Sequence, residues 1–240
     1  MTNIKVSVVT VCFNSEKTIE QTFKSLLSQT DSDFEYVVID GGSKDSTINI
    51  IERYIPLFER KGITFRHISE KDDGIYDAMN KGINLATGDI IGLLNSDDYY
   101  LTDTIFNLKK IINEYPNIDV IHGCVINKRE DEIISVIGNN SDVLTRGMIQ
   151  HPACFIKKLT YKKYGLYNTK YRFAADYDFM IRLKLQGASF LFVPIIFAVF
   201  NEDGAGNCRK SRNEAYKLKL NYGFISLLKY YILLLRNYLR

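Results

Sequence analysis

Hydrophobic and polar positions follow two distinct periods along the first hundred residues. Apolar runs at residues 4–11, 34–39, 64–68 and 89–94 have the length and composition of β-strands. Between them, apolar residues recur every three or four positions, as on one face of a helix. These residues are Ile19, Phe23 and Leu26, then Ile48, Ile51 and Ile55, then Met79, Ile83 and Ala86. The alternation predicts an α/β fold with a mostly parallel sheet that helices cover on both faces.

The second half of the chain has a less regular pattern. A helix is predicted at 105–113, ended by Pro116, and a strand at 119–123. Beyond residue 127, an extended run lies at 134–138 and a strand-like segment at 150–158. A helical segment at 175–187 and a long apolar run at 189–200 follow. We interpret this half as a smaller region with a mixed sheet, joined to the first half without a linker.

Length and composition narrow the class of protein. The 240 residues, 46% of them hydrophobic, suffice for one α/β domain with a small appendage. A net charge of +3 is too small to require nucleic acid as a partner. Four scattered cysteines without a C-x-x-C pair favour reduced thiols. The N-terminus lacks the pattern of a signal peptide and no apolar run approaches about 20 residues, so we expect a cytoplasmic protein.

Polar residues follow the predicted strands at the edge where α/β sheets bind ligands. Asp40 is followed by two glycines, so its carboxylate could accept the imide N–H of uracil while the backbone approaches the ring. Turn and capping chemistry explains Asp40 equally well. Thr10 and Asn14 follow the first strand, where Asn14 could equally begin a helix. This loop contains no glycine, which argues against a dinucleotide-binding G-x-G-x-x-G motif.

Two adjacent carboxylates, Asp97 and Asp98, end the fourth strand in the sequence NSDD. Hard oxygen ligands at this place suggest a Mg²⁺ or Mn²⁺ site that holds a phosphorylated substrate. A solvated loop is the structural alternative. Upstream, the block SEKDDGIYDAMNKG at 69–82 has an acidic turn before a helix, which alone is ordinary turn and capping chemistry.

Taken together, the segment 69–98 resembles the donor-binding half of inverting family 2 glycosyltransferases, which have the GT-A fold. Asn95-Ser96-Asp97 stands where that family usually carries Asp-x-Asp, so one charge is missing from the metal surroundings. The resemblance is strong over residues 4–100 and looser over 145–206. It implies a single GT-A domain at 1–207, with a donor half at 1–100, an acceptor half at 101–207, and a C-terminal helical segment at 208–240.

The resemblance also implies roles for individual residues. Asp97 would bind Mn²⁺ or Mg²⁺, and Asp98 would support the loop or contact a sugar. Lys81 could contribute to the motif or be a solvated helix charge. The residues implied to bind the nucleotide are Thr10, Asn14, Asp40, Glu70, Asp72, Asp77, Asn80, Asn95 and Ser96.

Inverting transfer needs a base on the acceptor side of the anomeric carbon. Asp176, in the sequence AADYDF, aligns with the aspartate of the family's Glu-Asp motif, although Ala175 replaces the glutamate. Without the resemblance, Asp176 would be interpreted as a helix cap. With it, Asp176 is the predicted general base, and Asp178 and His151 are predicted to support the site or contact a sugar. Glycines in the segment 201–206 predict a mobile loop that could cover the donor.

The C-terminal segment 222–240 has apolar residues at helical spacing, Phe224, Leu228, Tyr231 and Leu235, beside basic residues. This pattern suits a helix lying on an anionic membrane surface, and equally a helix packed on the domain or on another subunit, which leaves a homodimer open.

The resemblance therefore implies a metal-dependent inverting glycosyltransferase that moves a hexose or N-acetylhexosamine from a UDP-sugar to a glycan or lipid-linked glycan acceptor in surface polysaccharide biosynthesis. Two alternatives are a non-catalytic nucleotide- or glycan-binding protein of the same fold and a sugar nucleotidyltransferase. The second would normally need a glycine-rich and basic phosphate loop near the N-terminus, which the sequence lacks.

Overall fold

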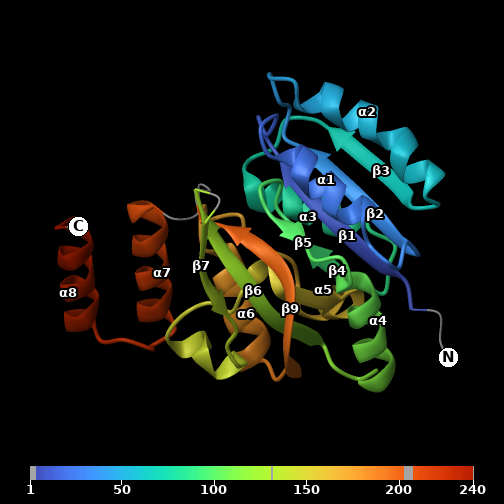
Figure 1. Cartoon of the computed structure of the whole chain (residues 1–240). Coiled ribbons are helices and arrows are strands. Elements are labelled where there is room, and N and C mark those ends of the chain that lie inside the picture. Colours follow the sequence, from blue (N-terminus) through green and yellow to red (C-terminus); the bar gives the residue numbers. More distant parts are fainter. Residues whose placement is uncertain (1–3, 131, 203–207, 240) are drawn as a thin grey trace.

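The computed structural model describes residues 4–130, 132–202 and 208–239. A central sheet is flanked by helices, and two further helices follow at the C-terminus (Figure 1). The strands are β1 (Val6–Cys12), β2 (Phe34–Asp40), β3 (Thr64–Ser69), β4 (Ile90–Leu93), β5 (Tyr99–Tyr100), β6 (Val120–Arg129), β7 (Glu132–Ile137), β8 (Cys154–Lys157) and β9 (Phe190–Asn201). The helices are α1 (Ile19–Leu27), α2 (Thr47–Arg60), α3 (Ile75–Leu85), α4 (Thr104–Glu114), α5 (Lys158–Tyr164), α6 (Ala175–Leu185), α7 (Arg209–Asn221) and α8 (Leu227–Tyr238), with 3₁₀ turns η1 (Ser141–Thr145) and η2 (His151–Ala153).

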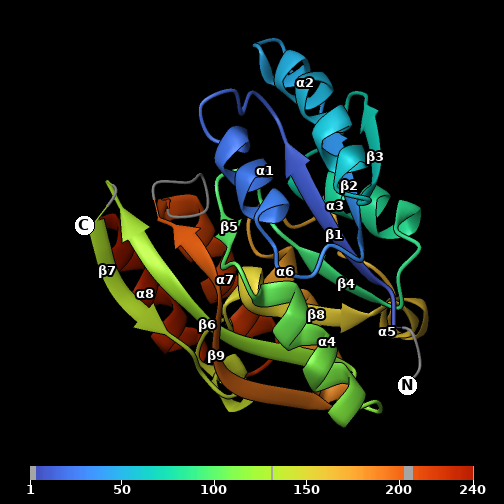
Figure 2. The ribbon, with the colours of Figure 1, turned by 45° about the vertical axis from the view of Figure 1, so that its right-hand side comes forward.

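All the strands belong to one sheet with the order β3-β2-β1-β4-β8-β6-β9-β5, and β7 pairs with β6. The first four pair in parallel, as the alternating pattern predicts. β8 then lies antiparallel between β4 and β6, and β9 runs parallel to β6. The second half of the sheet is therefore mixed, as expected, and it continues the first half without a break (Figure 2).

Two hydrophobic clusters lie on opposite faces of this sheet. Helices α1, α2 and α4 cover one face, where alternate β1 residues such as Val6 and Val8 are buried. Helices α3, α5 and α6 cover the other, together with Val9 and Val11 of the same strand. This period of two explains why every residue of β1 is buried, including the polar Ser7 and Thr10. The prediction of an α/β fold with a parallel first half and a mixed second half is thus confirmed.

Three elements differ from the sequence prediction. β5 has two residues and depends on pairing with the distant β9, so no local pattern marks it. α5 was not predicted because its seven residues are too short to show a helical period. The C-terminal helix begins at Leu227 after the N-cap Ser226, and Phe224 instead packs against the core.

His122 in β6 provides a prediction about acid stability. It is 1% exposed beside Phe190 and Phe192, and neither ring nitrogen has a hydrogen-bond partner among the described residues. Burial, followed by the nearby charge of Lys184, lowers the pKa of His122 to about 4. Between roughly pH 6.5 and pH 4, His122 is protonated in the unfolded chain but stays neutral in the folded protein. Uptake of this proton favours the unfolded chain, so the free energy of unfolding should fall by about 3 kcal/mol over this range.

We expect His122→Phe to remove this part of the acid sensitivity while keeping an aromatic ring between its two neighbours. Urea unfolding at about pH 7 and about pH 4.5 measures the effect, with His67→Phe on the exposed edge strand β3 as the control. Equal losses of stability in the wild type and His122→Phe would show that the pKa of His122 is not depressed in the folded protein.

Candidate functional site

The predicted site residues gather at one edge of the sheet. The parallel strands β1 to β4 all end at this edge. β8 is antiparallel to β4, so the turn that precedes β8 lies beside the residues that follow β4. His151 in this turn is therefore close to the segment that carries Asp97, although the two are separated widely in the sequence.

The loops after β1 and β2 are joined by hydrogen bonds. The Asn14 backbone N–H donates to Ser43 Oγ and its side-chain oxygen accepts from the Lys44 N–H, each at 2.8 Å. Asn14 itself has a positive φ of 51°, which asparagine tolerates better than most residues. Ser15 and Ser96 share a hydrogen bond of 2.8 Å, which ties the first loop to the segment after β4. The strand-end loops thus form one connected surface.

Asp40 and Thr10 are fully buried. The Asp40 carboxylate accepts hydrogen bonds from the Gly42 and Ser43 N–H groups at 3.0 Å and from the Ser69 hydroxyl at 2.7 Å. Its contacts therefore fix the loop that would face a base, and a direct contact with uracil would require these bonds to rearrange. The predicted nucleotide contacts of Asp40 and Thr10 stay predictions.

The acidic turn after β3 lies against the loop after β2. A Cβ atom added to Gly41 would meet a carboxylate oxygen of Asp72, so a larger residue at this position would force the Asp72 side chain to shift. Lys81 is not a free helix charge, because it forms ion pairs with Glu70 at 2.8 Å and with Asp77 at 3.3 Å. The structure thus brings Glu70, Asp72 and Asp77 together at this turn, and their predicted contacts with a nucleotide stay predictions.

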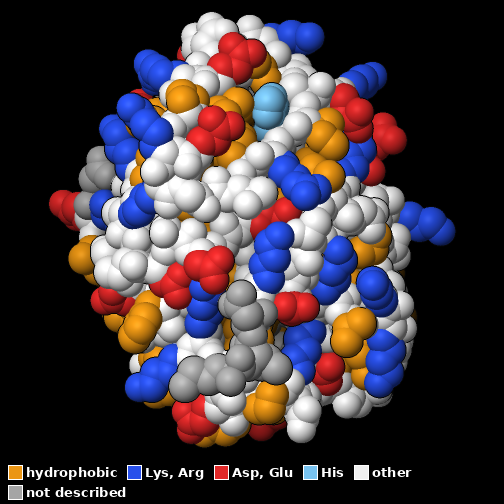
Figure 3. Space-filling model, turned by 90° about the vertical axis from the view of Figure 1, so that its right-hand side faces the viewer, with side chains coloured by type: hydrophobic (Ala, Val, Ile, Leu, Met, Phe, Trp, Pro, Cys, Tyr) orange, Lys and Arg blue, Asp and Glu red, His pale blue; other side chains and the backbone are white. Residues whose placement is uncertain are grey.

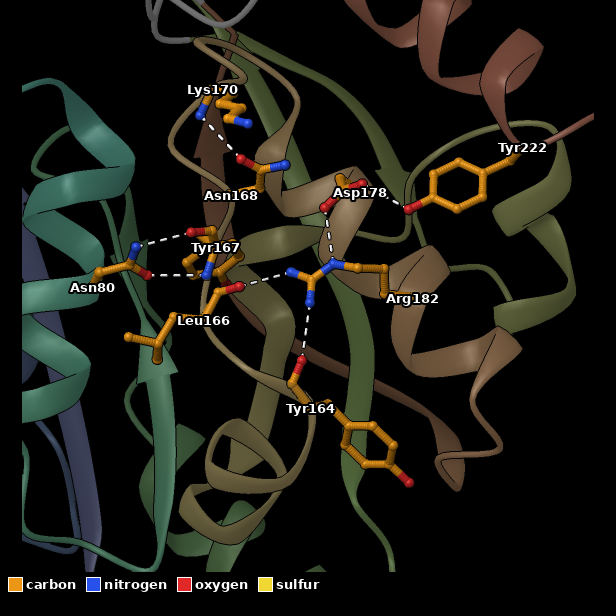
Figure 4. Close-up of polar contacts among 9 residues, drawn as sticks. All are labelled: Asn80, Tyr164, Leu166, Tyr167, Asn168, Lys170, Asp178, Arg182 and Tyr222. Carbon is orange, nitrogen blue, oxygen red and sulfur yellow. Dashed lines mark hydrogen bonds and ion pairs between the residues drawn. The ribbon is translucent and has the colours of Figure 1, made fainter.

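Asn80 points from α3 toward Tyr167 (Figure 4). Its amide donates to the Tyr167 carbonyl at 2.9 Å and accepts from the Tyr167 N–H at 3.0 Å. Asn80 therefore fixes the segment that leads to α6, and in this arrangement both amide groups are occupied by the protein. A direct contact of Asn80 with ribose or diphosphate stays a prediction.

The segment after β4 combines carboxylates with an unpaired oxygen. Asp97 is partly exposed, and partial burial raises the pKa of its carboxyl. Asp98 is fully buried and accepts the Asn201 N–H at 3.0 Å, and burial together with the charge of Asp97 raises its pKa well above the usual range. The side-chain oxygen of Asn95 is buried and has no hydrogen-bond partner in the part of the chain that the structure describes. Ser96 beside them is also buried.

These oxygens fit a hard divalent cation in chemistry and in charge. A cation near Asp97 would lower the cost of its ionisation and could give the Asn95 oxygen a partner. Within the described ranges, no group of three or more His, Cys, Asp or Glu side chains is arranged to bind a metal on its own. Substrate phosphate oxygens would therefore have to supply most of the ligands.

Asp176 lies in the first turn of α6 and faces α3. Its carboxylate accepts a hydrogen bond of 2.8 Å from the Tyr76 hydroxyl. The His151 ring lies 3.4 Å from the Tyr167 hydroxyl, and burial lowers its pKa against the opposing effect of Asp176. The sequence analysis did not single out Tyr76 and Tyr167, because their role depends on elements that meet only in the folded protein.

Asp178 is buried and its carboxylate has two partners (Figure 4). Arg182 Nε lies 2.9 Å from one oxygen and the Tyr222 hydroxyl donates to the other at 2.7 Å. The predicted contact of Asp178 with a sugar stays a prediction, whereas its contacts here join α6 to the end of α7. The predicted mobile loop at 201–206 begins at this edge with Asn201 and Glu202, and residues 203–206 lie outside the described residues.

The chain was compared with known families and structures. A model of glycosyl transferase family 2 matches residues 7–184. A PGL/p-HBAD biosynthesis glycosyltransferase of Mycobacterium bovis is 32% identical over 200 residues, which cover 82% of this chain and 77% of the relative.

Two solved structures have the same fold at low sequence identity. Staphylococcus aureus TarS 1–349 in complex with UDP-GlcNAc has a TM-score of 0.72 and 19% identity, over 96% of this chain and 70% of that one. The mannosyltransferase PcManGT of Pyrobaculum calidifontis, in complex with GDP-Man and Mn²⁺, has a TM-score of 0.69 and 16% identity, over 91% and 63% respectively. This chain spans 38% of the longer TarS structure.

Proposed function

Because the chain belongs to glycosyl transferase family 2, and is thus a glycosyltransferase, we propose that it transfers a hexose or N-acetylhexosamine from a UDP-sugar. The acceptor is a glycan or lipid-linked glycan in surface polysaccharide biosynthesis, and the anomeric carbon is inverted. One observation carries the proposal: the carboxylate-bearing segment after β4 and the turn that carries His151 lie side by side at one edge of the sheet.

The choice of UDP rests on the relatives. The TarS structure is a complex with UDP-GlcNAc, whereas the PcManGT structure of the same fold is a complex with GDP-Man and Mn²⁺. A fold shared at below 20% identity does not select the base. Asp40 is buried at the start of this loop, and the glycines after it let the backbone approach a flat ring, which supports a base-binding role without selecting uracil.

The proposed reaction is a direct displacement. An acceptor hydroxyl oxygen bonds to the anomeric carbon, the bond from that carbon to the diphosphate oxygen breaks, and UDP leaves with the electron pair. Asp176 takes the proton of the attacking hydroxyl. The Tyr76 hydroxyl, 2.8 Å from Asp176, orients the carboxylate by donating a hydrogen bond to it.

Asp97, with Asn95 beside it, would hold Mn²⁺ or Mg²⁺. When bound, the ion supplies positive charge that stabilises the departing diphosphate. The raised pKa of Asp97 and the buried Asn95 oxygen, which has no hydrogen-bond partner among the described residues, support this assignment, because a cation stabilises a partly buried carboxylate and an unpaired amide oxygen.

Calorimetric titration of the wild type tests the donor half of the proposal. We expect UDP to bind in the presence of Mn²⁺, to bind less tightly with chelator, and to bind more tightly than GDP or TDP. Release of UDP from UDP-GlcNAc, UDP-Glc and UDP-Gal then identifies the sugar. If folded protein binds none of the three nucleotides, the proposal fails and only the fold is shared with the family.

The same proposal extends to a membrane surface through the C-terminal segment 208–240. This segment carries eight Lys and Arg residues and one acidic residue, a formal charge of +7, whereas the remainder of the chain carries −4. Charge of this sign is complementary to anionic lipid headgroups. Among the described residues, no helix is long and apolar enough to cross a membrane, so α8 would lie in the interface rather than span it.

The exposed side of α8 suits this placement. Asn237 faces α7, where its amide accepts from Arg212 Nε at 2.7 Å and donates to the Arg209 carbonyl at 3.0 Å. Lys229 and Arg236 lie two helical turns apart on α8, beside its exposed apolar residues. α8 is the outermost helix of the molecule in Figure 1. Its exposed apolar residues form an outward stripe, which consists of Leu227, Leu228, Tyr231, Ile232, Leu235, Tyr238 and Leu239, each between 44% and 76% exposed. By contrast, the face of the molecule in Figure 3 carries charges of both signs and scattered hydrophobic side chains.

We expect the protein to sediment with vesicles that contain phosphatidylglycerol and not with pure phosphatidylcholine, and we expect salt to weaken the binding. The double change Leu228→Glu and Leu235→Glu should lower vesicle binding at least about tenfold, because it places two charges in the apolar stripe. Leu159→Glu, on the exposed side of α5, is the matched control. If the double variant instead converts a lipid-free dimer into a monomer and vesicle binding is absent, the stripe is an interface between two copies.

A further inference from the structure

Glu214, in the middle of α7, is bonded to the segment that begins α6. Its carboxylate accepts three successive backbone N–H groups, from Arg172 at 3.0 Å, Phe173 at 2.6 Å and Ala174 at 2.8 Å. Hydrogen bonds to an ionised carboxylate are stronger than those between neutral groups. Three of them at consecutive residues leave the chain little freedom just before Asp176.

The start of α6 depends on this contact from outside the helix. Its N-cap is Ala174, which has no side chain that can cap the first turn. In many helices a glutamate of the same helix reaches back to the N-cap N–H. Here Glu214 performs that task from another helix, and its negative charge lies at the favourable end of the α6 dipole.

A second contact of α7 lies on the other side of Asp176. The Tyr222 hydroxyl donates to Asp178, whose other oxygen pairs with Arg182. Figure 4 shows that Arg182 also donates to the carbonyl oxygens of Tyr164 and Leu166, at 2.9 Å and 2.7 Å. α7 therefore anchors the chain immediately before Asp176 and two residues after it.

We propose that Glu214 is a positioning residue for Asp176, and this inference rests on the proposed transferase function. α7 begins at Arg209, beyond the residues 7–184 that match the family model, so the family motif does not provide this support. With Tyr76 bonded to Asp176 from α3, the carboxylate is held between a helix of the donor half and a segment fixed by α7. α7 is thus part of the catalytic arrangement as well as a link to α8.

Glu214→Ala should lower the turnover number while leaving donor binding unchanged. A displacement of a catalytic group by about 1 Å can cost on the order of 10²-fold in rate, so we expect a fall in kcat of about 10- to 100-fold. The Kd for UDP with Mn²⁺ should stay within about twofold, because the three hydrogen bonds described for Glu214 go to residues 172–174 and not to the loops after β1 to β4. Glu214→Gln, which keeps an acceptor oxygen, should recover part of the rate.

The experiment measures release of UDP from the active UDP-sugar, with water as the acceptor until the glycan acceptor is known. Lys217→Ala, at an exposed position of the same helix, is the matched control. Amide hydrogen exchange is measured in parallel, and Glu214→Ala should accelerate exchange at Arg172, Phe173 and Ala174 without affecting the loop at Gly42 and Ser43. Exchange reports whether the segment is held, independently of activity.

The outcomes separate this inference from the proposed function. If the wild type releases UDP and Glu214→Ala does so at the same rate, the positioning role is wrong and the proposed function stands. Unchanged exchange at the three amides also overturns the positioning role. If the wild type turns over no UDP-sugar, the proposed function fails and the positioning role fails with it. A fall in kcat that is accompanied by an equal loss of UDP affinity indicates general unfolding and contradicts the positioning role.

Discussion

Replacing Asp176 with Asn should reduce sugar transfer by about 10²- to 10⁴-fold, the range expected when a general base is removed. The amide oxygen of Asn can still accept the hydrogen bond of the Tyr76 hydroxyl, which lies 2.8 Å from Asp176. The start of α6 should therefore keep its structure. Binding of UDP with Mn²⁺ should also persist, because the change removes a proton acceptor and not a donor contact.

Asp142→Asn provides the control for this variant, because Asp142 is an exposed carboxylate in η1 that pairs with Lys184 on the surface. Its transfer rate should equal that of the wild type. Retained UDP binding with a normal transfer rate in Asp176→Asn would mean that another group takes the proton. Binding without turnover in the wild type itself would favour a non-catalytic nucleotide-binding protein.

Asp97→Ala should abolish the metal-dependent part of UDP binding. A cation that bridges protein and diphosphate contributes several kcal/mol, so the affinity measured with Mn²⁺ should fall on the order of 10²-fold, to the level of the wild type in chelator. In the wild type, binding should also weaken as the pH falls through the raised pKa of Asp97, because a carboxylate must lose its proton to bind metal.

Calorimetry with and without Mn²⁺ measures this difference, and Asp73→Ala is the control, since Asp73 is an exposed carboxylate in the turn after β3. Chelator should have no further effect on Asp97→Ala. If chelator weakens binding in Asp97→Ala as much as in the wild type, the ion is held elsewhere and the assignment of Asp97 is wrong.

The strongly periodic elements could be predicted from the sequence. Strands β1 and β2 and helices α1 to α4 each bury one face or both, so their apolar spacing reports their environment directly. β5 could not be predicted, since a two-residue strand exists only through its pairing with β9. The class of fold and the sheet edge that carries the site can be predicted from these periodic strands and helices alone.

The partners of the candidate site residues were less predictable. Asp40 and Asn80 carry polar groups that could serve a ligand, yet both are bonded to backbone groups of the protein. Asp40 is bonded to the tight loop that follows it, and Asn80 is bonded to a segment 87 residues away in the sequence. A sequence motif identifies the residue type at a position and not the direction of its side chain. Glu214 shows the converse, because no motif marks a glutamate that caps a distant helix.

The position of β8 has a consequence for how this protein could diversify. The strand comes from the second half of the chain, yet it lies beside β4 of the first half, with Ile91 opposite Ile156. Recombination that exchanged whole halves between relatives would have to preserve this register and the buried Phe155 next to Gly92. New acceptor specificity should therefore arise by substitution in the loops at the sheet edge rather than by shuffling of complete halves.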